Sequence, residues 1–436
     1  MRKSLIAALA VVAMVLTACG GADTTEPAPD TDTGSTDETV DDAPEEEPDA
    51  DAGEDEQITR ADADLVIWTD ESRTPIIQAI GDQFAEDQGI SVAVQQLDFG
   101  QIRDSLVTQG PAGEGPDIII GAHDWLGQLV INGVVEPIEL GDRADEFLDV
   151  ALEAFTYEGQ LYGLPYAVEN IALFRNTDLA PEPPSDFEDL AQTALDLVEA
   201  GEAEIPLALQ VGADGDPYHF YPLFTSFGSS VFAFNDDGTY DPDQLLVDSP
   251  EGLAFAEALA DLADRGVLNA DLDFGLAVEA FASGNAPYTI SGPWNVGAYE
   301  DAGVPFVVEA IPSLGGESAA PFVGVQGFMI SAYAENPLFA TDFVLNYLGT
   351  EDIARQLFES GQRLPALASV ADEVSDDPII AGFSEAGTIG HPLPSIPAMA
   401  AVWSDWGIAE RDIILGVDDP AERMSQAGGL IREAIG

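Results

Sequence analysis

The segment GPDIIIGAHDW (residues 115–125) brings three reactive side chains together at the end of an apolar run. The apolar residues predict a short buried strand that ends near Gly121, and His123, Asp124 and Trp125 follow it directly. A histidine beside a carboxylate could act in acid–base chemistry, help to hold a metal ion, or bind a ligand without changing it.

A metal site would need several converging ligands, and the sequence offers few. The only histidines are His123, His219 and His391, and none belongs to an HExxH motif or an i, i+4 pair. Cys19 is the only cysteine, so no thiolate pair and no intramolecular disulfide can form. We therefore expect neither a metal nor a cofactor.

Catalysis is supported only by carboxylates. Asp124 with Glu169 or Asp216 could serve as the acid and the nucleophile of a glycosidase. However, all but 16 of the 81 acidic residues lie in residues 61–436, so a pair of carboxylates carries little information. There is no GxSxG motif after a strand, no P-loop and no GxGxxG motif. We therefore predict that the protein binds a ligand and is not an enzyme.

Strand and helix patterns alternate around the opening segment. Predicted strands cover residues 64–68, 90–95 and 116–120, and predicted helices cover residues 75–88, 101–108 and 125–131. Such alternation gives a parallel sheet, and ligands of these sheets collect beyond the carboxyl ends of the strands. Residues 69–73 and 121–125 should therefore lie at one edge of the sheet and converge on one cleft.

A second α/β set follows residues 157–170. The tetrad SDFE (185–188) predicts a capping box that opens a helix to Ala200. Further predicted helices cover residues 218–227, 249–265, 399–411 and 420–435, and predicted strands cover residues 205–210, 288–291 and 321–331.

The first residues predict export and lipid attachment. Arg2 and Lys3 precede an apolar run that is short for a spanning helix, which needs about 20 apolar residues. Leu16-Thr-Ala-Cys19 resembles the lipobox of bacterial lipoproteins, which implies a signal peptide over residues 1–18 and a diacylglyceryl group on Cys19. Residues 20–60 contain 16 acidic residues and no aromatic residue, so we expect residues 19–60 to be a lipidated cysteine followed by a disordered acidic tether.

The chain is strongly anionic, with a net charge of −68 and no lysine after Lys3. Such a surface repels nucleic acid and anionic lipid, which argues against both as partners. Self-repulsion also strains the folded state unless salt screens it, so we hypothesise a high-salt habitat; drift towards acidic codons is the alternative explanation.

Seven motifs occur in the order and spacing of the maltose/maltodextrin-binding proteins, which this chain resembles over about 370 residues. They are LVIW at Leu65, GEGPDII at Gly113 with AHD at Ala122, PYAVE at Pro165, DPY at Asp216, GPW at Gly292, PFVGV at Pro321, and PSIPAM at Pro394 with Trp403. Members of that family are sugar receptors of ABC importers with two α/β lobes that close on the ligand. The resemblance therefore implies a two-lobed periplasmic-binding-protein-like fold of type II, each lobe a sheet flanked by helices.

The resemblance also implies two kinds of sugar contact. Five polar side chains would hydrogen-bond sugar hydroxyls: Ser72, Arg73, Asp124, Glu169 and Asp216. Three aromatic rings would stack on the C–H face of a pyranose: Tyr218, Trp294 and Trp403. Three other aromatic residues are predicted to pack in the core: Trp68, Tyr162 and Tyr221.

The chain departs from the family pattern at four positions. Gly121 stands where a stacking tryptophan is usual, Trp125 replaces an arginine, Ser404 a tyrosine and Gly407 another arginine. We expect Trp125 and Trp406 to substitute in part for the missing groups, with Trp125 counted among the ligand-binding residues. The sugar stays open between maltodextrins, a related α-glucoside such as trehalose, and another oligosaccharide.

The resemblance implies lobes that the chain crosses more than once. We expect residues 61–168 and 326–378 in the N-terminal lobe and residues 169–325 and 379–436 in the C-terminal lobe. Expected hinges lie near residues 167–170, 325–328 and 376–380.

The expected partners are an oligosaccharide, the permease subunits of an ABC importer and, through the lipid, a cell membrane. We expect an extracytoplasmic monomer, at the cell surface or in a periplasm. A membrane-anchored glycosidase and a receptor for a non-sugar solute such as a peptide or polyamine are the alternatives.

The charge generates a first prediction. We expect the free energy of unfolding to be larger in molar than in dilute NaCl, because the screening length falls from about 10 Å at about 0.1 M salt to about 3 Å at about 1 M. Thermal unfolding in the two buffers tests this, and equal midpoints would contradict the high-salt hypothesis.

Overall fold

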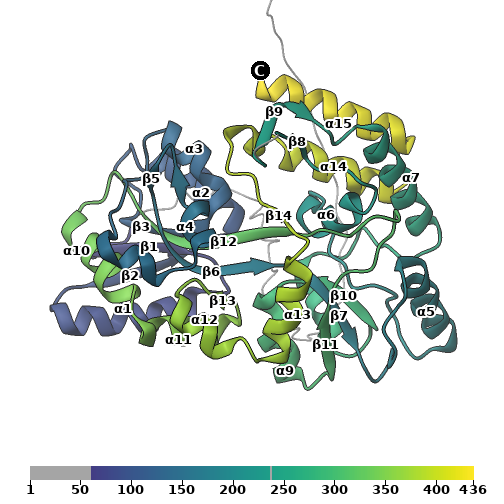
Figure 1. Ribbon diagram of the computed structural model, residues 1–436, viewed down its shortest axis with the longest axis horizontal. Coiled ribbons are helices and arrows are strands. Elements are labelled where there is room, and N and C mark those ends of the chain that lie inside the picture. The colour runs from purple at the N-terminus through teal and green to yellow at the C-terminus, as the bar shows by residue number, and fades with distance from the viewer. Residues whose placement is uncertain (1–59, 236–237) are drawn as a thin grey trace, which may run out of the picture. The chain divides into compact units, whose positions relative to one another are not determined.

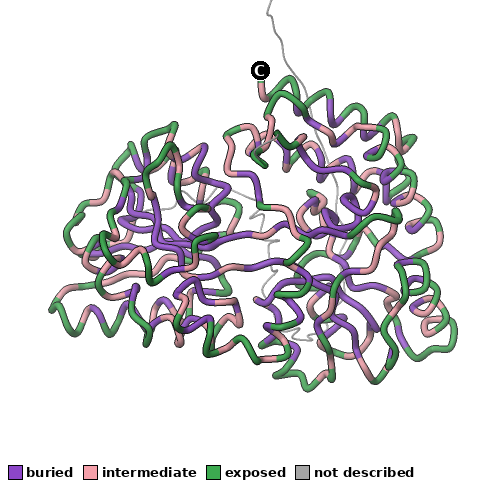
Figure 2. The backbone as a smooth tube through the Cα atoms, viewed as in Figure 1, coloured by how far each residue is buried: buried purple, intermediate pink, exposed green. Residues whose placement is uncertain are grey.

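The computed structural model describes residues 60–235 and 238–436. The predicted signal peptide, Cys19 and the tether before Arg60 lie outside the described residues. Buried hydrophobic side chains form one cluster from residues 65–164 and 325–370, which defines the N-terminal lobe. Two further clusters, from residues 171–322 and 383–431, define the C-terminal lobe. Figure 2 shows the buried backbone inside both lobes and along the strands between them.

The N-terminal lobe begins with the predicted alternation of strands and helices. Its first elements are β1 (Leu65–Thr69), α1 (Thr74–Gln88), β2 (Val92–Gln96), α2 (Phe99–Gln109), β3 (Ile118–Ala122), the 3-10 helix η1 (His123–Trp125) and α3 (Leu126–Ile131). Strand β1 pairs in parallel with β2 and β3, so the residues that follow β1 and β3 leave the sheet at the same edge. Trp68 and Tyr162 are buried in this lobe, as predicted.

The rest of the lobe comes from two separate parts of the chain. The first part contains η2 (Gly141–Glu146), α4 (Asp149–Ala154), β4 (Thr156–Tyr157), β5 (Gln160–Leu161) and β6 (Leu164–Asn170). The second contains β12 (Phe322–Ile330), α10 (Pro337–Thr341), the π-helix η4 (Asp342–Leu348), α11 (Glu351–Gly361), β13 (Leu364–Pro365) and α12 (Ala368–Val374). Only with both parts is the core of this lobe complete.

Strands β6 and β12 connect the lobes. The main sheet has the order β13-β6-β12-β3-β1-β2, and β12 runs antiparallel to both β3 and β6. The sheet is therefore mixed, and the predicted parallel pairing holds for β1, β2 and β3. Figure 1 shows β6 and β12 running from one lobe into the other.

The C-terminal lobe is built mainly from the middle of the chain. It contains β7 (Ala172–Asn176), α5 (Phe187–Ala200), α6 (Pro217–Thr225), β8 (Phe232–Phe234), β9 (Tyr240–Leu245), α7 (Pro250–Asp264), α8 (Phe274–Ala282), β10 (Tyr288–Ser291), η3 (Pro293–Asn295), α9 (Val296–Ala302) and β11 (Phe306–Glu309). The end of the chain adds α13 (Pro378–Gly387), β14 (His391–Pro392), η5 (Pro397–Ala401), α14 (Trp403–Ile414) and α15 (Pro420–Ile435). Strand β7 pairs antiparallel with β10 and β11.

Two predicted details of this lobe are wrong. Residues 205–210 form no strand; the segment lies beside β10 with one bridge, between Leu207 and Tyr288. The Ala208 amide donates to the Tyr288 carbonyl at 2.9 Å, and the Ala208 carbonyl accepts from the Thr289 hydroxyl at 2.6 Å, so these contacts hold the segment to β10 without a continuous ladder. Helix α5 is capped by Asp186 rather than Ser185, with the Asp186 side chain accepting from the Asp189 amide.

The expected hinge segments fall at different kinds of element. Residues 167–170 and 325–328 lie in the connecting strands β6 and β12, and residues 376–380 lie at the start of α13. The pairing of β12 with β6 shifts register between Gln326 and Gly327, which is a β-bulge or irregularity. Bending at these segments and the lobe boundaries stay predictions.

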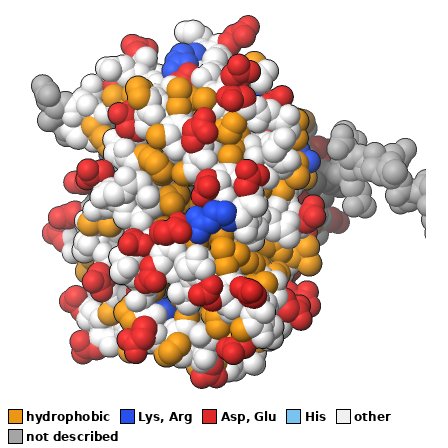
Figure 3. Space-filling view, turned by 90° about the vertical axis from the view of Figure 1, so that its right-hand side faces the viewer, with side chains coloured by type: hydrophobic (Ala, Val, Ile, Leu, Met, Phe, Trp, Pro, Cys, Tyr) orange, Lys and Arg blue, Asp and Glu red, His pale blue; other side chains and the backbone are white. Residues whose placement is uncertain are grey.

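The few arginines of the described residues neutralise only a small part of the negative charge of the carboxylates. Each of the eleven arginines of the described residues lies within 4.0 Å of a carboxylate oxygen. Figure 3 shows one face on which acidic side chains are spread widely and basic side chains are few. Most carboxylates therefore depend on solvent and salt for compensation.

Glu410 on α14 is a fully buried carboxyl group without a hydrogen-bond partner. Its side chain is 0% exposed, and neither oxygen has a partner in the part of the chain that the structure describes. Burial, and secondarily the negative charge of Asp216, raises the pKa of Glu410 well above its usual range. The folded protein therefore keeps Glu410 protonated at a pH at which the unfolded chain would ionise it.

This carboxyl group generates a stability prediction. Because its folded pKa is raised, its contribution to stability is present below the unfolded value of 4.5 and is lost as the pH rises towards the folded pKa. Replacing Glu410 with leucine should therefore stabilise the protein at neutral pH by about 1–3 kcal/mol. The gain should shrink on acidification towards the unfolded pKa.

Urea unfolding at neutral and acidic pH measures both effects. The control is Glu433→Leu, which changes an exposed glutamate on α15. A destabilised Glu410→Leu variant, or a gain independent of pH, would contradict the prediction.

Candidate functional site

A tryptophan ring covers a glycine at one strand end in each lobe. Near the end of β3, a Cβ atom on Gly121 would lie 2.0 Å from the Trp125 ring, and directly after β10 a Cβ atom on Gly292 would lie 2.0 Å from the Trp294 ring. Each glycine is therefore required by the ring that packs on it. Gly121 and Trp125 depend on each other, because the ring of Trp125 occupies the space that a side chain at position 121 would need.

The two tryptophans differ in exposure. Trp125 is 4% exposed and packs against Phe99, with ring centroids 4.7 Å apart, inside the N-terminal core. Trp294 is only partly buried. Trp294 is therefore the better placed of the two to offer a ring face to a ligand.

Polar side chains follow β1 at the same sheet edge. Arg73 pairs with Asp70, and its Nε donates to the Tyr166 hydroxyl at 2.6 Å. The Ser72 hydroxyl donates to Asp70 Oδ1 at 2.6 Å, and Ser72 itself is exposed. Asp70 therefore holds both predicted residues.

Asp124 presents a buried acceptor without a partner. The residue is 9% exposed, and its Oδ1 has no hydrogen-bond partner among the described residues. Burial raises the pKa of Asp124 to about 7, and the charge of Arg103 opposes this shift. The group is therefore poised to change charge near neutral pH.

Glu169 lies on the connecting strand β6 and is 7% exposed. Its Oε1 accepts from Gln326 Nε2 at 2.7 Å, and its Oε2 accepts from Arg363 Nε at 2.6 Å. Both partners come from the second part of the N-terminal lobe. Glu169 is therefore fixed by two side chains more than 150 residues away in the sequence.

Asp216 caps α6 in the C-terminal lobe and holds His219. The carboxylate accepts from the His219 backbone amide and lies 3.0 Å from His219 Nδ1, and Gln210 also donates to it. Burial alone would raise the pKa of Asp216, but the charge and hydrogen bonds of His219, together with Gln210, lower it. Asp216 is therefore an ionised acceptor at neutral pH.

Tyr218 marks the point where the predicted residues converge. Its pKa is raised well above the usual value by burial and by the negative charges of Glu169, Asp124 and Asp216. Its ring lies 6.4 Å from that of Trp294 and 6.1 Å from that of Phe322, centroid to centroid. Tyr218 thus lies beside Trp294, and carboxylates from both lobes are near enough for their charges to act on its hydroxyl group.

Arg363 joins this group from the N-terminal lobe. It is 5% exposed, and its guanidinium carbon lies 5.8 Å from the centroid of the Trp294 ring in the other lobe. Trp403 is more peripheral, with its partly buried ring 6.1 Å from Phe322. Trp406 is fully buried against Phe224, so the expectation that it replaces a missing site residue is wrong: its ring fills the core. Tyr221 is a core residue, as predicted.

Sequence reasoning missed four side chains of the group: Asp70, Tyr166, Gln326 and Arg363. Asp70 lies within residues 69–73, which the sequence places at the sheet edge, so the same rule could have predicted it as a site residue. Nothing in the local sequence marks Arg363, because only tertiary folding brings it to Glu169.

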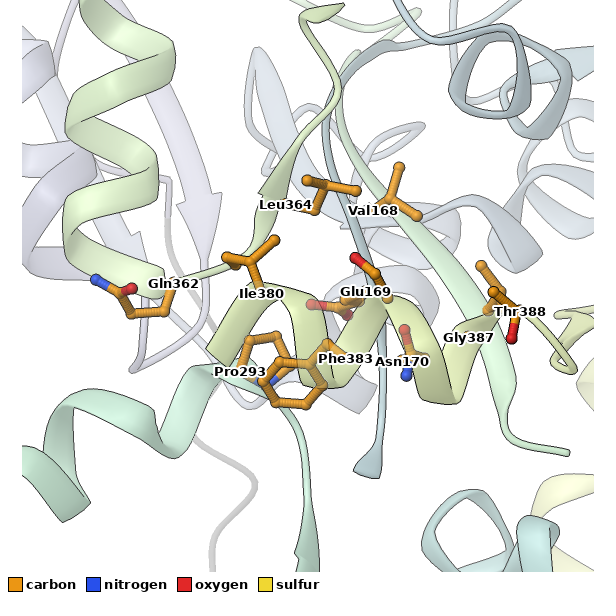
Figure 4. Close-up of a pocket in the computed structure, with 12 residues that line it drawn as sticks. Val168, Glu169, Asn170, Pro293, Gln362, Leu364, Ile380, Phe383, Gly387 and Thr388 are labelled. Carbon is orange, nitrogen blue, oxygen red and sulfur yellow. The ribbon is translucent and has the colours of Figure 1, made fainter. Parts of the chain in front are cut away.

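A separate cavity of about 270 Å³ lies beside the connecting strands. Its wall includes Val168 and Asn170 of β6, and Ile380 and Phe383 of α13, as Figure 4 shows. Trp294, Tyr218 and Asp124 are absent from its wall. The cavity is therefore distinct from the group of predicted residues, although Glu169 borders both.

Across residues 60–235 and 238–436, no three histidine, cysteine or acidic side chains are grouped so that they could hold a metal ion. In the same ranges, no helix combines the length and the apolar character needed to cross a bilayer.

Comparison with known proteins identifies the family. Residues 79–382 match the model of the bacterial extracellular solute-binding proteins. A galactooligosaccharide-binding protein of Bacillus subtilis is 26% identical over 391 residues, covering 86% of this chain and 90% of that protein. A maltotriose-binding protein of Pyrococcus abyssi is 28% identical over 351 residues, covering 78% of this chain and 75% of that protein.

The fold leads to the same group. A structure of Thermus thermophilus maltotriose-binding protein bound with maltotriose superposes with a TM-score of 0.80 and 30% identity, covering 85% of this chain and 100% of that chain. The two-lobed α/β architecture is thus the type II periplasmic-binding fold that the motifs predict. The chain belongs to the bacterial extracellular solute-binding proteins and, within them, to the maltose/maltodextrin-binding family.

Proposed function

We propose that this protein is the substrate-binding lipoprotein of a carbohydrate ABC importer and binds a short oligosaccharide of the maltodextrin type or a related α-glucoside such as trehalose. The observation that carries the proposal is the group around Tyr218, where Trp294 and carboxylates of both lobes meet. Aromatic rings suit the apolar face of a pyranose, and carboxylates suit its hydroxyls. Two relatives are named as maltotriose-binding and galactooligosaccharide-binding proteins, and these names also support an oligosaccharide ligand.

Binding would proceed by hinge closure. Arg73, Asp124 and Glu169 are each at least nine-tenths buried, so a sugar reaches them only when the lobes separate. The lobes also touch away from β6 and β12, where α11 meets α9 and η3. A ligand that contacts both lobes favours the closed state by its differential affinity for that state. The closed receptor would then dock, as a monomer, on the permease subunits.

The proposed role is binding without turnover. Asp124 and Asp216 could resemble the paired carboxylates of a glycosidase, and that enzyme is the second candidate. However, Asp216 is engaged by its own helix and by His219, and Glu169 is engaged by Gln326 and Arg363. These carboxylates are therefore held as fixed acceptors, which favours a binding role.

Calorimetry with maltotriose, maltose and trehalose tests the ligand class. Replacing Trp294 with alanine should weaken the tightest of these complexes at least about tenfold, or about 1.4 kcal/mol, because the stacking face is lost. The control is Phe274→Ala, which removes an aromatic ring that is 47% exposed on α8.

Chromatography of the sugars after prolonged incubation should show no new product. Unchanged affinity of the Trp294 variant would mean that the site is misplaced, and released glucose would favour the glycosidase.

Asp124 generates a pH prediction. Its pKa of about 7 means that it is protonated below neutral pH, and a charged acceptor binds a sugar hydroxyl more strongly than a neutral one. Affinity should therefore rise several-fold as the pH increases from one unit below to one unit above this pKa. The Asp124→Asn variant should lose this pH dependence, and a dependence that persists in the variant would assign it to another group.

The lipid anchor is proposed from Cys19, whose position after an apolar run resembles a lipobox. Expression of the full chain in a bacterial host should place the protein in the membrane fraction, and Cys19→Ser should release it into the soluble extracytoplasmic fraction. A Cys19→Ser protein that stays in the membrane fraction would argue against attachment at this residue.

A further inference from the structure

We propose that Arg363, positioned by Glu169, contacts the ligand directly and selects a neutral sugar with two adjacent oxygen atoms beside Trp294. This inference rests on the proposed function, and it assigns Glu169 a positioning role in place of the direct sugar contact expected from the sequence.

Glu169 holds Arg363 through one nitrogen and leaves the others free. Glu169 Oε2 accepts from Nε at 2.6 Å, while the other carboxylate oxygen is engaged by Gln326. In the described part of the chain, neither terminal nitrogen of Arg363 has a hydrogen-bond acceptor, although the side chain is only 5% exposed. These nitrogens are not among the fully buried polar atoms of the described residues that lack a partner, so they keep some access to solvent and can be reached by a ligand.

The guanidinium group of Arg363 lies close to the Trp294 ring, on which the sugar is proposed to stack. Its guanidinium carbon is 5.8 Å from the centroid of the Trp294 ring. The positive charge of Arg363 also opposes the rise in the pKa of Tyr218 that burial and nearby carboxylates cause. Arg363 belongs to the N-terminal lobe, whereas Trp294 and Tyr218 belong to the C-terminal lobe. A sugar on Trp294 would therefore meet a donor from the opposite lobe, as closure requires.

The backbone before Arg363 adopts an unusual conformation. Gln362 ends α11 with a φ of +49°, and it is one of two non-glycine residues with positive φ among those described. Left-handed backbone is unfavourable for a side chain larger than glycine and is concentrated at functional sites. In this protein, the left-handed residue is the C-cap of α11 and comes directly before Arg363.

The hydrogen-bond donors of Arg363 limit the class of ligand that fits the site. A guanidinium group only donates hydrogen bonds, and its planar fork matches two adjacent acceptor oxygens. Neutral sugars present such pairs as vicinal hydroxyl groups. An anionic sugar is disfavoured, because the charges of Arg73 and Arg363 are already balanced by Asp70 and Glu169, and Asp216 adds a negative charge.

Binding of maltotriose and its singly deoxygenated analogues tests the proposal. Arg363→Met keeps much of the side-chain volume but removes the donors, and it should weaken maltotriose binding about 10- to 100-fold. Arg363→Lys keeps the charge but not the fork, and it should fall between Arg363→Met and the wild type. Arg355→Met is the matched control, since it removes a partly exposed arginine of α11 that pairs with Glu373, and it should bind like the wild type.

The analogues distinguish a ligand contact from a structural role. At least one deoxy analogue should bind the wild-type protein about tenfold more weakly than maltotriose does, yet bind the Arg363→Met variant as well as maltotriose does. A purely structural arginine would weaken every analogue by the same factor, and that result would overturn the inference. If Arg363→Met does not fold, the same comparison with Arg363→Lys decides.

The same binding experiment separates the role of Arg363 from the proposed ligand class. Wild-type protein that binds maltotriose, together with an Arg363→Met variant of equal affinity, would overturn only the role of Arg363. Wild-type protein that does not bind maltotriose would contradict the maltodextrin-type ligand and this inference together.

Discussion

The buried carboxylate of Glu169 sets the geometry of the region where the two lobes meet. A charge in this position costs several kcal/mol unless it is paired and hydrogen-bonded, and removal of one partner of a buried pair typically costs about 3–5 kcal/mol. Glu169 meets this requirement with Gln326 on the neighbouring strand and with Arg363 beyond α11. The same contacts join β6, β12 and the turn before β13, so the element that connects the lobes also orders the candidate site.

The scarcity of positive charge makes the use of each arginine informative. Eleven arginines face a large excess of carboxylates, and all eleven are paired in the described residues. Two of them, Arg73 and Arg363, are almost fully buried near the site, where each is matched by one carboxylate. Among the described residues, Asp124 and Asp216 have no arginine partner, so the site keeps an excess of negative charge and disfavours an anionic ligand.

Packing links a glycine to a tryptophan at a strand end of each lobe. In the N-terminal lobe, the ring of Trp125 lies over Gly121 and against Phe99. In the C-terminal lobe, Gly292 and Trp294 repeat the same arrangement, with the ring partly exposed. One lobe thus encloses its tryptophan, while the other leaves its tryptophan partly exposed.

The sequence by itself determined the family, the order of most helices and strands, and the sheet edge at which residues 69–73 and 121–125 gather. These features follow from local hydrophobic periods and from motifs, both of which are written in consecutive residues. Only the tertiary structure decided that Glu169 is held by Arg363, that Trp406 is a core residue, and that residues 205–210 fail to form a strand. Each of these outcomes involves a partner far away in the chain: Arg363 for Glu169, Phe224 for Trp406, and β10 for residues 205–210. Contacts of that kind are invisible until the lobes have folded.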